Sequence, residues 1–233
     1  MPIELQLLYQ DEHLLAVNKP PGLATLVEGW HPDRLTAMRW VEMHYGKVYL
    51  VHRLDKFTSG VLLFARTAEA HRHLSLQFET HKVFKRYQAI LHGEPAWEEM
   101  LADSPLRSNV GRRHRTVVSP QGKAAETWFR VLARGKGFAW VEVQPRTGRT
   151  HQIRAHAAAL GHPLLGDVLY GAPPSPFLER PALHACALTF IHPESGKELT
   201  LQAPLAEDLV RALKLLGIVF HDPQPSYPTH PAP

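Results

Sequence analysis

Short apolar runs bounded by turn residues recur along this chain, and they constrain its fold more than any other feature. Runs of this length and composition are typical of β-strands. The expected strands are residues 5–9, 14–17, 61–65, 83–91, 124–132, 138–143, 183–191 and 198–202. Because strand hairpins alternate with only a few helices, we expect an α+β fold built on a mainly antiparallel mixed sheet.

Helical spacing of apolar residues marks four further segments. The expected helices are residues 34–45, 68–81, 150–160 and 209–216. In the third, Thr150 is expected to cap the first turn and Gly161 to end the helix. Ile153 lies in its buried stripe, whereas His151 and Arg154, three residues apart, share a different face.

The length of the chain leaves room for one large folded domain or two small ones. The 233 residues can bury a full core, and we expect a single domain over residues 1–220. Residues 221–233 contain five prolines and no core pattern, which predicts a disordered tail. We find no membrane-length apolar run and no signal-peptide pattern, so we expect a cytoplasmic protein. The single cysteine excludes an internal disulfide, and the sixteen dispersed histidines do not predict a metal site.

Positive charge is gathered in one segment of the chain. Residues 106–154 hold eleven Lys and Arg and two acids, although the net charge of the whole chain is only +4. A one-sided field of this kind suits a polyanion, while a solvated basic face would explain the charge alone equally well. Residues 109–115 are expected to form a flexible loop that clamps phosphates through Arg112, Arg113 and Arg115.

Asp55 is the strongest candidate for chemistry. It lies between Arg53 and Lys56, and a Thr-Ser-Gly turn and an apolar run follow it. This pattern places Asp55 on a loop at the edge of a sheet, where reacting groups are common. The nearby cation favours an ionised carboxylate, which can act as a nucleophile or a base. The ordinary alternative is an aspartate that caps a turn or forms an ion pair.

Five motifs follow one another along the chain. They are Asn18-Lys19-Pro20-Pro21-Gly22, His52-Arg53-Leu54-Asp55, Lys85-Arg86-Tyr87, residues 147–154 with 161–167, and Leu183-His184-Ala185. In this order they resemble the motifs of the RluA-type pseudouridine synthases, which isomerise uridine to pseudouridine in structured RNA. The resemblance implies a curved mixed sheet with flanking helices and an active-site cleft, so residues 1–220 would be a catalytic domain. Because the first expected strand begins near residue 5, we expect no S4-like RNA-binding module.

The resemblance implies three catalytic residues. Asp55 corresponds to the catalytic aspartate, Tyr87 to a tyrosine that stacks on the target base, and Arg154 to an arginine that pairs with the aspartate. A guanidinium fork would hold the carboxylate in one orientation. From the residues alone, Tyr87 also fits a core aromatic of a strand, and Arg154 fits a surface arginine of a helix.

Five further residues are expected to bind the substrate. Arg53, Arg149 and His151 are predicted to contact RNA, and Arg53 could fill the stack that a flipped uridine vacates. Lys19 is predicted to contact a phosphate, although Pro-Pro-Gly beside it also fits a plain rigid turn. Leu183 is implied to wall the uracil pocket, and a core leucine is the equally natural reading.

The isomerisation gains and loses no atom, so no cofactor is expected. The expected partner is structured RNA, either tRNA or rRNA, and no obligate protein partner is evident. Two other functions stay open. One is a non-catalytic RNA-binding or RNA-folding protein on the same scaffold. The other is a hydrolase of nucleosides or glycosides, which usually pairs two carboxylates, and no second acid stands out near these motifs.

Overall fold

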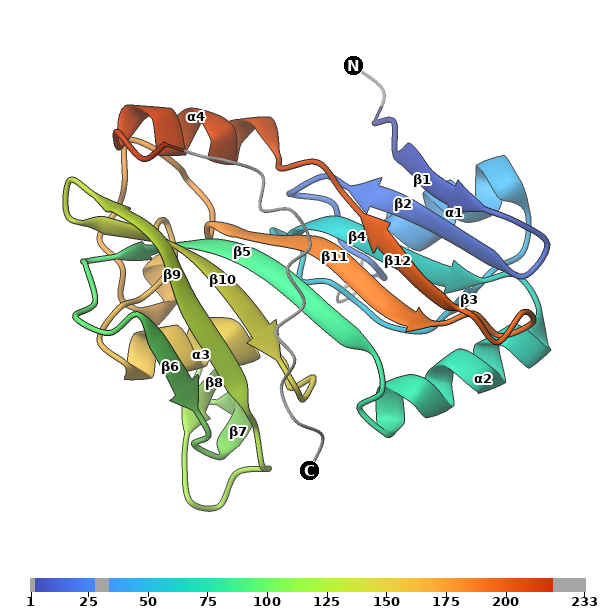
Figure 1. Ribbon diagram of the computed structural model, residues 1–233, viewed down its shortest axis with the longest axis horizontal. Coiled ribbons are helices and arrows are strands. Elements are labelled where there is room, and N and C mark those ends of the chain that lie inside the picture. Colours follow the sequence, from blue (N-terminus) through green and yellow to red (C-terminus); the bar gives the residue numbers. More distant parts are fainter. Residues whose placement is uncertain (1–2, 28–33, 220–233) are drawn as a thin grey trace.

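A long, curved sheet with helices packed against it forms the protein, which the computed structural model describes over residues 3–27 and 34–219 (Figure 1). Within these residues the strands of the sheet are β1 (Gln6–Gln10), β2 (Leu14–Lys19), β3 (Tyr49–Leu50), β4 (Ser59–Ala65), β5 (Phe84–His92), β6 (Glu99–Ala102), β9 (Thr127–Gly135), β10 (Phe138–Pro145), β11 (Leu183–Ile191) and β12 (Glu198–Gln202). A separate hairpin consists of β7 (Leu106–Val110) and β8 (Arg115–Val118). The helices are α1 (Ala37–Tyr45), α2 (Ala68–Glu79), α3 (Gln152–Ala159) and α4 (Glu207–Leu215), with a short 3-10 turn, η1 (Val168–Tyr170).

The order of the strands brings distant parts of the chain together. They run β1-β2-β4-β11-β5-β10-β9-β6, with β3 paired to β4 and β12 paired to β11. Among the described strands the pairings are antiparallel except that of β4 with β11, which is parallel. That short pairing sets His184 and Ala185 opposite Ser59 and Gly60. The predicted α+β fold with a mainly antiparallel mixed sheet is confirmed.

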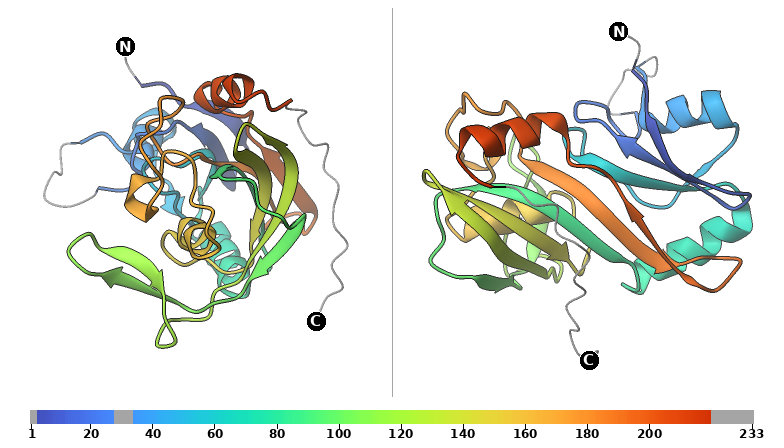
Figure 2. Two further views of the ribbon diagram at one scale, coloured as in Figure 1. Left: turned by 90° about the vertical axis from the view of Figure 1, so that its left-hand side faces the viewer. Right: turned by 45° about the horizontal axis from the view of Figure 1, so that its top comes forward.

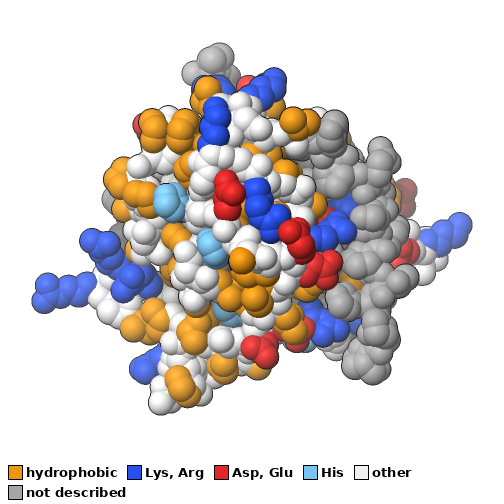
Figure 3. Space-filling model, turned by 60° about the vertical axis from the view of Figure 1, so that its left-hand side comes forward, with side chains coloured by type: hydrophobic (Ala, Val, Ile, Leu, Met, Phe, Trp, Pro, Cys, Tyr) orange, Lys and Arg blue, Asp and Glu red, His pale blue; other side chains and the backbone are white. Residues whose placement is uncertain are grey.

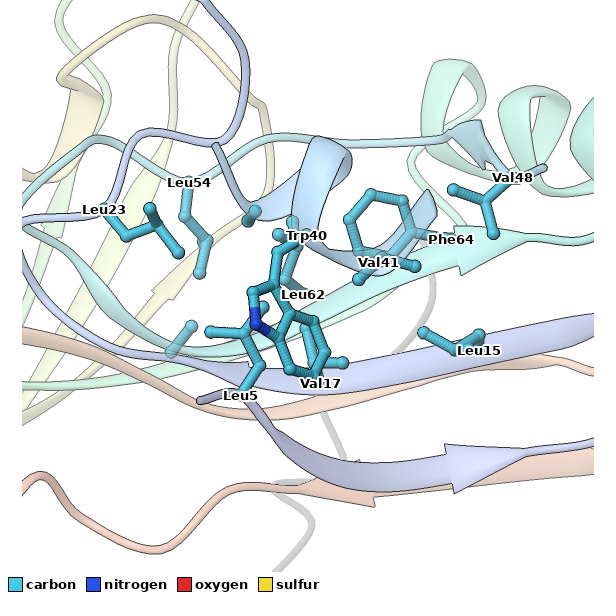
Figure 4. Packing of buried hydrophobic residues seen from close by; sticks show 12 residues of the cluster. Leu5, Leu15, Val17, Leu23, Trp40, Val41, Val48, Leu54, Leu62 and Phe64 are labelled. Carbon is cyan, nitrogen blue, oxygen red and sulfur yellow. The ribbon is translucent and has the colours of Figure 1, made fainter. Parts of the chain in front are cut away.

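Strands β2 and β4 are buried on both faces, which explains their unbroken apolar runs. On one face, Val17 and Leu62 pack against Trp40 of α1 (Figure 4). On the other face, Leu63 packs in a cluster with Leu74 of α2. The two helices therefore cover opposite faces of the same pair of strands.

The other half of the sheet is covered in the same way (Figure 2). On one face, Leu91 of β5 lies in a cluster with Ile153 of α3. On the opposite face, Ile90 and Trp140 pack with Leu213 of α4. Alternate residues of one strand thus reach two separate cores, as the pleat of a strand requires. No helix among the described residues has the length and apolar character to cross a membrane.

Most element boundaries lie close to the predicted ones, and three predictions about where an element begins are corrected first. The first helix begins at Ala37 instead of residue 34, because the Thr36 side chain caps it by accepting from the backbone N–H of Arg39. Ser59 and Gly60, expected as a turn, are the first residues of β4. Thr150 does not cap α3, because His151 occupies the capping position and makes no side-chain capping bond.

The expected loop over residues 109–115 is largely a hairpin. Its first residues belong to β7 and its last residue begins β8, so only the turn between them is irregular. Strands β3, β6, β7 and β8 were not predicted, since each is short and carries few buried residues. The prediction of a disordered tail over residues 221–233 lies outside the described residues.

Candidate active site

A cavity of about 590 Å³ opens where the parallel strands β4 and β11 meet β5 and α3. A volume of this size suits a small-molecule or nucleoside site. Seven of the eleven predicted site residues line it, namely Arg53, Asp55, Tyr87, Arg149, His151, Arg154 and Leu183. The motifs that lie far apart in the sequence therefore converge on one cavity.

Asp55 lies on the loop between β3 and β4, and the backbone on both sides of it is fixed by side chains. Thr25 Oγ1 donates to the carbonyl of Leu54 at 2.8 Å and accepts from the N–H of Leu54 at 3.2 Å. Arg180 donates from Nη1 to the carbonyl of Phe57 at 3.0 Å. The side chain of Asp55 is 26% exposed and faces the cavity, so its carboxylate is presented on a rigid frame.

Lys19 is part of this frame and does not reach the surface. It is fully buried at the end of β2. Its ammonium donates to the carbonyls of Pro20, Leu23 and Lys56, at 3.0, 2.7 and 3.1 Å. The predicted phosphate contact of Lys19 is therefore wrong, because a phosphate cannot approach a buried ammonium that already donates to these carbonyls. Its contact with Lys56 instead holds the loop that carries Asp55.

Arg154 lies beside Asp55, but its guanidinium makes its bidentate pair of hydrogen bonds with a different acid. Its Nε and Nη2 donate to the two carboxylate oxygens of Asp167 at 2.7 and 2.8 Å. Its remaining terminal nitrogen, Nη1, is 3.6 Å from Oδ2 of Asp55. Arg154 does form the expected ion pair with Asp55, but its bidentate hydrogen bonds go to Asp167. The side chain of Arg154 is only 9% exposed, so the alternative of a surface arginine is wrong.

The surroundings of Arg154 and Tyr87, two neighbours of Asp55, favour the protonated form of each side chain. Burial alone would lower the pKa of Arg154, but the hydrogen bonds and charge of Asp167, together with Asp55, raise it. Burial first, and then the negative charge of Asp55, raise the pKa of Tyr87 well above its usual range. Arg154 therefore stays cationic and Tyr87 keeps its phenolic proton at neutral pH. Tyr87 lines the cavity from β5 and is only partly buried, so it is more than a core aromatic.

The turn before α3 is shaped by the buried amide of Gln152. Its Oε1 accepts from the hydroxyl of Thr147 at 2.7 Å and from the N–H of Arg149 at 3.0 Å. Its Nε2 donates to the carbonyl of Glu126 and to Oγ1 of Thr127. This network fastens the turn to β9 and sets Arg149 at the cavity.

Two side chains at the site were missed as functional candidates. Lys85 lines the cavity and donates from Nζ to the carbonyl of Thr147 at 2.8 Å. Burial, and then the charge of Arg149, lower the pKa of Lys85 to about 8. The strand period of two places Lys85 on the same face as Tyr87, so the sequence did hold a signal. Asp167 is the last residue of the motif over residues 161–167, but no neighbouring residue in the sequence indicated its bond to Arg154.

Arg112, Arg113 and Arg115 lie outside the cavity, at the tip of the β7–β8 hairpin, and all three are exposed. The hairpin projects from the rest of the molecule (Figure 2). Lys and Arg side chains also project at the left of the face in Figure 3, on the side where the hairpin lies. The hairpin is thus a cationic arm beside the cavity.

Comparisons with known proteins show which family and fold the chain is similar to. Residues 13–159 match the family model for RNA pseudouridylate synthase. The ribosomal large subunit pseudouridine synthase D of Zymomonas mobilis is 38% identical over 93% of this chain and 74% of its own length. The dual-specificity RNA pseudouridine synthase RluA of Escherichia coli is 39% identical over 86% of this chain and 93% of its own. Human RNA pseudouridylate synthase domain containing 4 superposes with a TM-score of 0.76 at 28% identity, covering 92% of this chain and 94% of that structure.

Proposed function

This chain belongs to the RluA-type RNA pseudouridine synthases, and on that premise we propose that Asp55 is its catalytic residue and that the cavity receives one flipped uridine. An enzyme of this family isomerises uridine to pseudouridine in RNA. The observation that carries the proposal is the position of Asp55, whose carboxylate faces the cavity within 3.7 Å of both Arg154 and His151.

The reaction has four steps, and residues of the cavity supply the carboxylate and the walls that these steps need. The bond between C1′ of the ribose and N1 of the base breaks, the base turns, C5 bonds to C1′, and C5 gives up its proton. Asp55 supplies the carboxylate that acts on the sugar or the base, and Arg154 holds that carboxylate in place. Tyr87 and Leu183 provide the walls that keep the detached uracil inside. No atom enters or leaves apart from protons exchanged with solvent, so the balance needs no co-reactant.

Asp167, the acid paired with Arg154, cannot supply the second carboxylate of the hydrolase alternative, whereas Glu79 also lines the cavity. Such enzymes need a second carboxylate that is free to act on the substrate or on water. Asp167 is only 1% exposed, and both of its oxygens accept from Arg154, so it is not available for that role. The non-catalytic alternative gains no support from a site whose Asp55, Tyr87 and Arg154 all line the cavity.

We propose structured RNA, either rRNA or tRNA, as the substrate, and a cytoplasmic location. Arg53, Lys85 and Arg149 place positive charge around the cavity, where the phosphates beside a flipped uridine would lie. The hairpin arginines extend that charge outward. Replacing Arg112, Arg113 and Arg115 together should flatten the salt dependence of RNA binding by about 0.7–0.9 in log–log slope for each phosphate that these arginines neutralise in the wild type. An unchanged slope would show that the hairpin does not touch RNA.

The direct test uses bulk bacterial RNA that carries tritium at uridine C5. Bond formation at C5 expels that hydrogen to water, so released tritium measures the isomerisation. We expect release by the wild type and none by Asp55→Asn, with RNA affinity and far-UV circular dichroism unchanged in the variant. Release by Asp55→Asn at the wild-type rate would refute the proposed role of Asp55. Free uracil as the product would restore the hydrolase reading.

A further inference from the structure

Tyr170, at the end of η1, touches both side chains that flank Asp55, although it does not line the cavity itself. Its ring covers the guanidinium of Arg154, with Cζ 4.9 Å from the ring centre. Its hydroxyl lies 3.1 Å from Nδ1 of His151 and 2.9 Å from the backbone nitrogen of Thr116. This one residue thus joins η1, α3 and β8.

The hydrogen positions around this hydroxyl follow from its partners. The backbone N–H of Thr116 can only donate, so the Tyr170 oxygen accepts from it. The Tyr170 hydroxyl still has its own proton to donate, and Nδ1 of His151, at 3.1 Å, is the acceptor that we assign to it. A neutral imidazole that accepts at Nδ1 carries its proton on Nε2.

Nε2 of His151 faces the catalytic carboxylate, at 3.7 Å from Oδ2 of Asp55. With the proton on Nε2, an N–H points at the carboxylate. If the proton were instead on Nδ1, the N–H groups of Thr116 and His151 would both point at the Tyr170 oxygen. The lone pair of Nε2 would then face the negative Oδ2 of Asp55. Burial lowers the pKa of His151, although Asp55 opposes this, so the neutral ring is the relevant form.

The backbone conformation of His151 is a second observation that indicates a fixed position for its ring. Its φ is 52°, in the left-handed region that non-glycine residues seldom adopt. Residues in sparsely populated backbone regions persist only where their surroundings fix them, and they gather at functional sites. Here the hydroxyl of Tyr170 and the turn of Gln152 supply that fixation.

We propose that Tyr170 is a positioning residue, which fixes His151 in the tautomer whose Nε2–H faces Asp55 and thereby sets the orientation of the catalytic carboxylate. The inference rests on the proposed role of Asp55. Because Thr116 belongs to β8, the same hydroxyl also ties the basic hairpin to the catalytic centre.

The first test needs no substrate. In protein labelled with ¹⁵N-histidine, the shifts of the two ring nitrogens report which one is protonated, and the signals missing in His151→Gln assign His151. We expect Nε2 protonated and Nδ1 bare in the wild type, and a mixture of tautomers in Tyr170→Phe. Tyr9→Phe is the matched control, because it removes another hydroxyl hydrogen bond, that to Asp11, and should leave His151 unchanged. A proton on Nδ1 in the wild type would overturn the proposal without any activity measurement.

The second test compares substitutions at His151. The amide nitrogen of Gln reaches the place of Nε2 and can still donate to Asp55, whereas that of Asn reaches only the place of Nδ1. Asn tolerates a positive φ better, so the Asn variant should be the more stable fold. We expect the opposite order in single-turnover tritium release, with His151→Gln the faster of the two. Faster release by His151→Asn would contradict the proposal.

For Tyr170→Phe we expect a single-turnover rate constant, measured with saturating RNA, lower by about three- to tenfold, which corresponds to the loss of one hydrogen bond. A wild-type rate would count against the positioning role. The failure of the underlying function is a separate result. If Asp55→Asn is active while Nε2 of His151 is protonated, the assignment of Asp55 is wrong and the tautomer stands. If Asp55→Asn is inactive while Nδ1 is protonated, only the role of Tyr170 is wrong.

Discussion

Substituting Gly60 by Ala should break the contact on which the cavity depends. Gly60 lies in β4 directly opposite Ala185 of β11, at φ +113°. A Cβ at this position would lie 2.1 Å from the carbonyl oxygen of Ala185 and 2.7 and 2.8 Å from its carbonyl carbon and its nitrogen. All three are backbone atoms, so no flexible side chain can move aside to relieve the clash.

The cost of Gly60→Ala can be worked out from this geometry. The strands must part by roughly 1 Å to reach ordinary contact, and overpacking of this kind costs about 1–3 kcal/mol. A side chain at positive φ adds about 1 kcal/mol. Parting the strands also strains the bond between Ser59 Oγ and His184 Nδ1, now 2.9 Å. We expect the free energy of unfolding to fall by about 2–4 kcal/mol, with loss of tritium release as β11 shifts at the cavity wall.

Gly46→Ala is the matched control for this prediction. Gly46 also has a positive φ, at +78°, but a Cβ there would meet nothing within 4 Å. It should therefore show only the conformational cost of its backbone, at φ 78° and ψ −166°, which is about 1–3 kcal/mol, and keep its activity. Urea unfolding followed by tryptophan fluorescence and circular dichroism measures both variants. Equal losses of stability in the two variants would refute the argument, since steric overlap with β11 would then contribute nothing.

Two further predictions concern buried charge. Asp167→Asn should lower the free energy of unfolding by about 3–5 kcal/mol and slow tritium release, because the buried Arg154 loses its bidentate carboxylate partner. Unchanged urea unfolding would contradict this prediction. Burial lowers the pKa of His184 to about 4, so the folded protein keeps this ring neutral while the unfolded chain takes up a proton near pH 6.5. Stability should therefore fall as the pH drops from about 6.5 to about 4, by up to about 1.4 kcal/mol per pH unit, and His184→Gln should flatten that slope in urea unfolding measured across the same range.

The sequence predicts those parts of the fold that local pattern determines. The apolar runs of β4 and β11 indicate strands because nearly every residue of these strands is buried, and residues 88–91 of β5 are buried in the same way. Ser59 and Gly60 have the composition of a turn, and pairing with distant parts of the chain makes them part of a strand. Ser59 pairs with His184 of β11, and Gly60 pairs with Ala185 of β11 and with Lys19 of β2. The short strands β6, β7 and β8 carry few buried residues, so their sequences hold little periodic signal.

The same division holds for the site. Asp55, Tyr87 and Arg154 could be found because each stands in a recognisable motif, and all three line the cavity. The partner of the Arg154 fork could not be found, because Asp167 reaches it only after the chain has turned back. Lys19 was misread because a lysine suggests solvent, whereas here backbone carbonyls surround its ammonium.

The sheet can be completed only late in translation, because its central strand β11 comes near the end of the chain. This strand lies between β4 and β5, yet it is translated long after both of them. A nascent chain that has emerged as far as α3 already contains Asp55, Tyr87 and Arg154, but β4 and β5 still have open edges toward each other. Pairings between segments so distant form slowly, and open edges invite pairing with other chains. Activity should therefore appear abruptly, when residues 183–191 leave the ribosome and close the gap. Truncated products that contain Asp55, Tyr87 and Arg154 but lack β11 should be inactive and prone to aggregate.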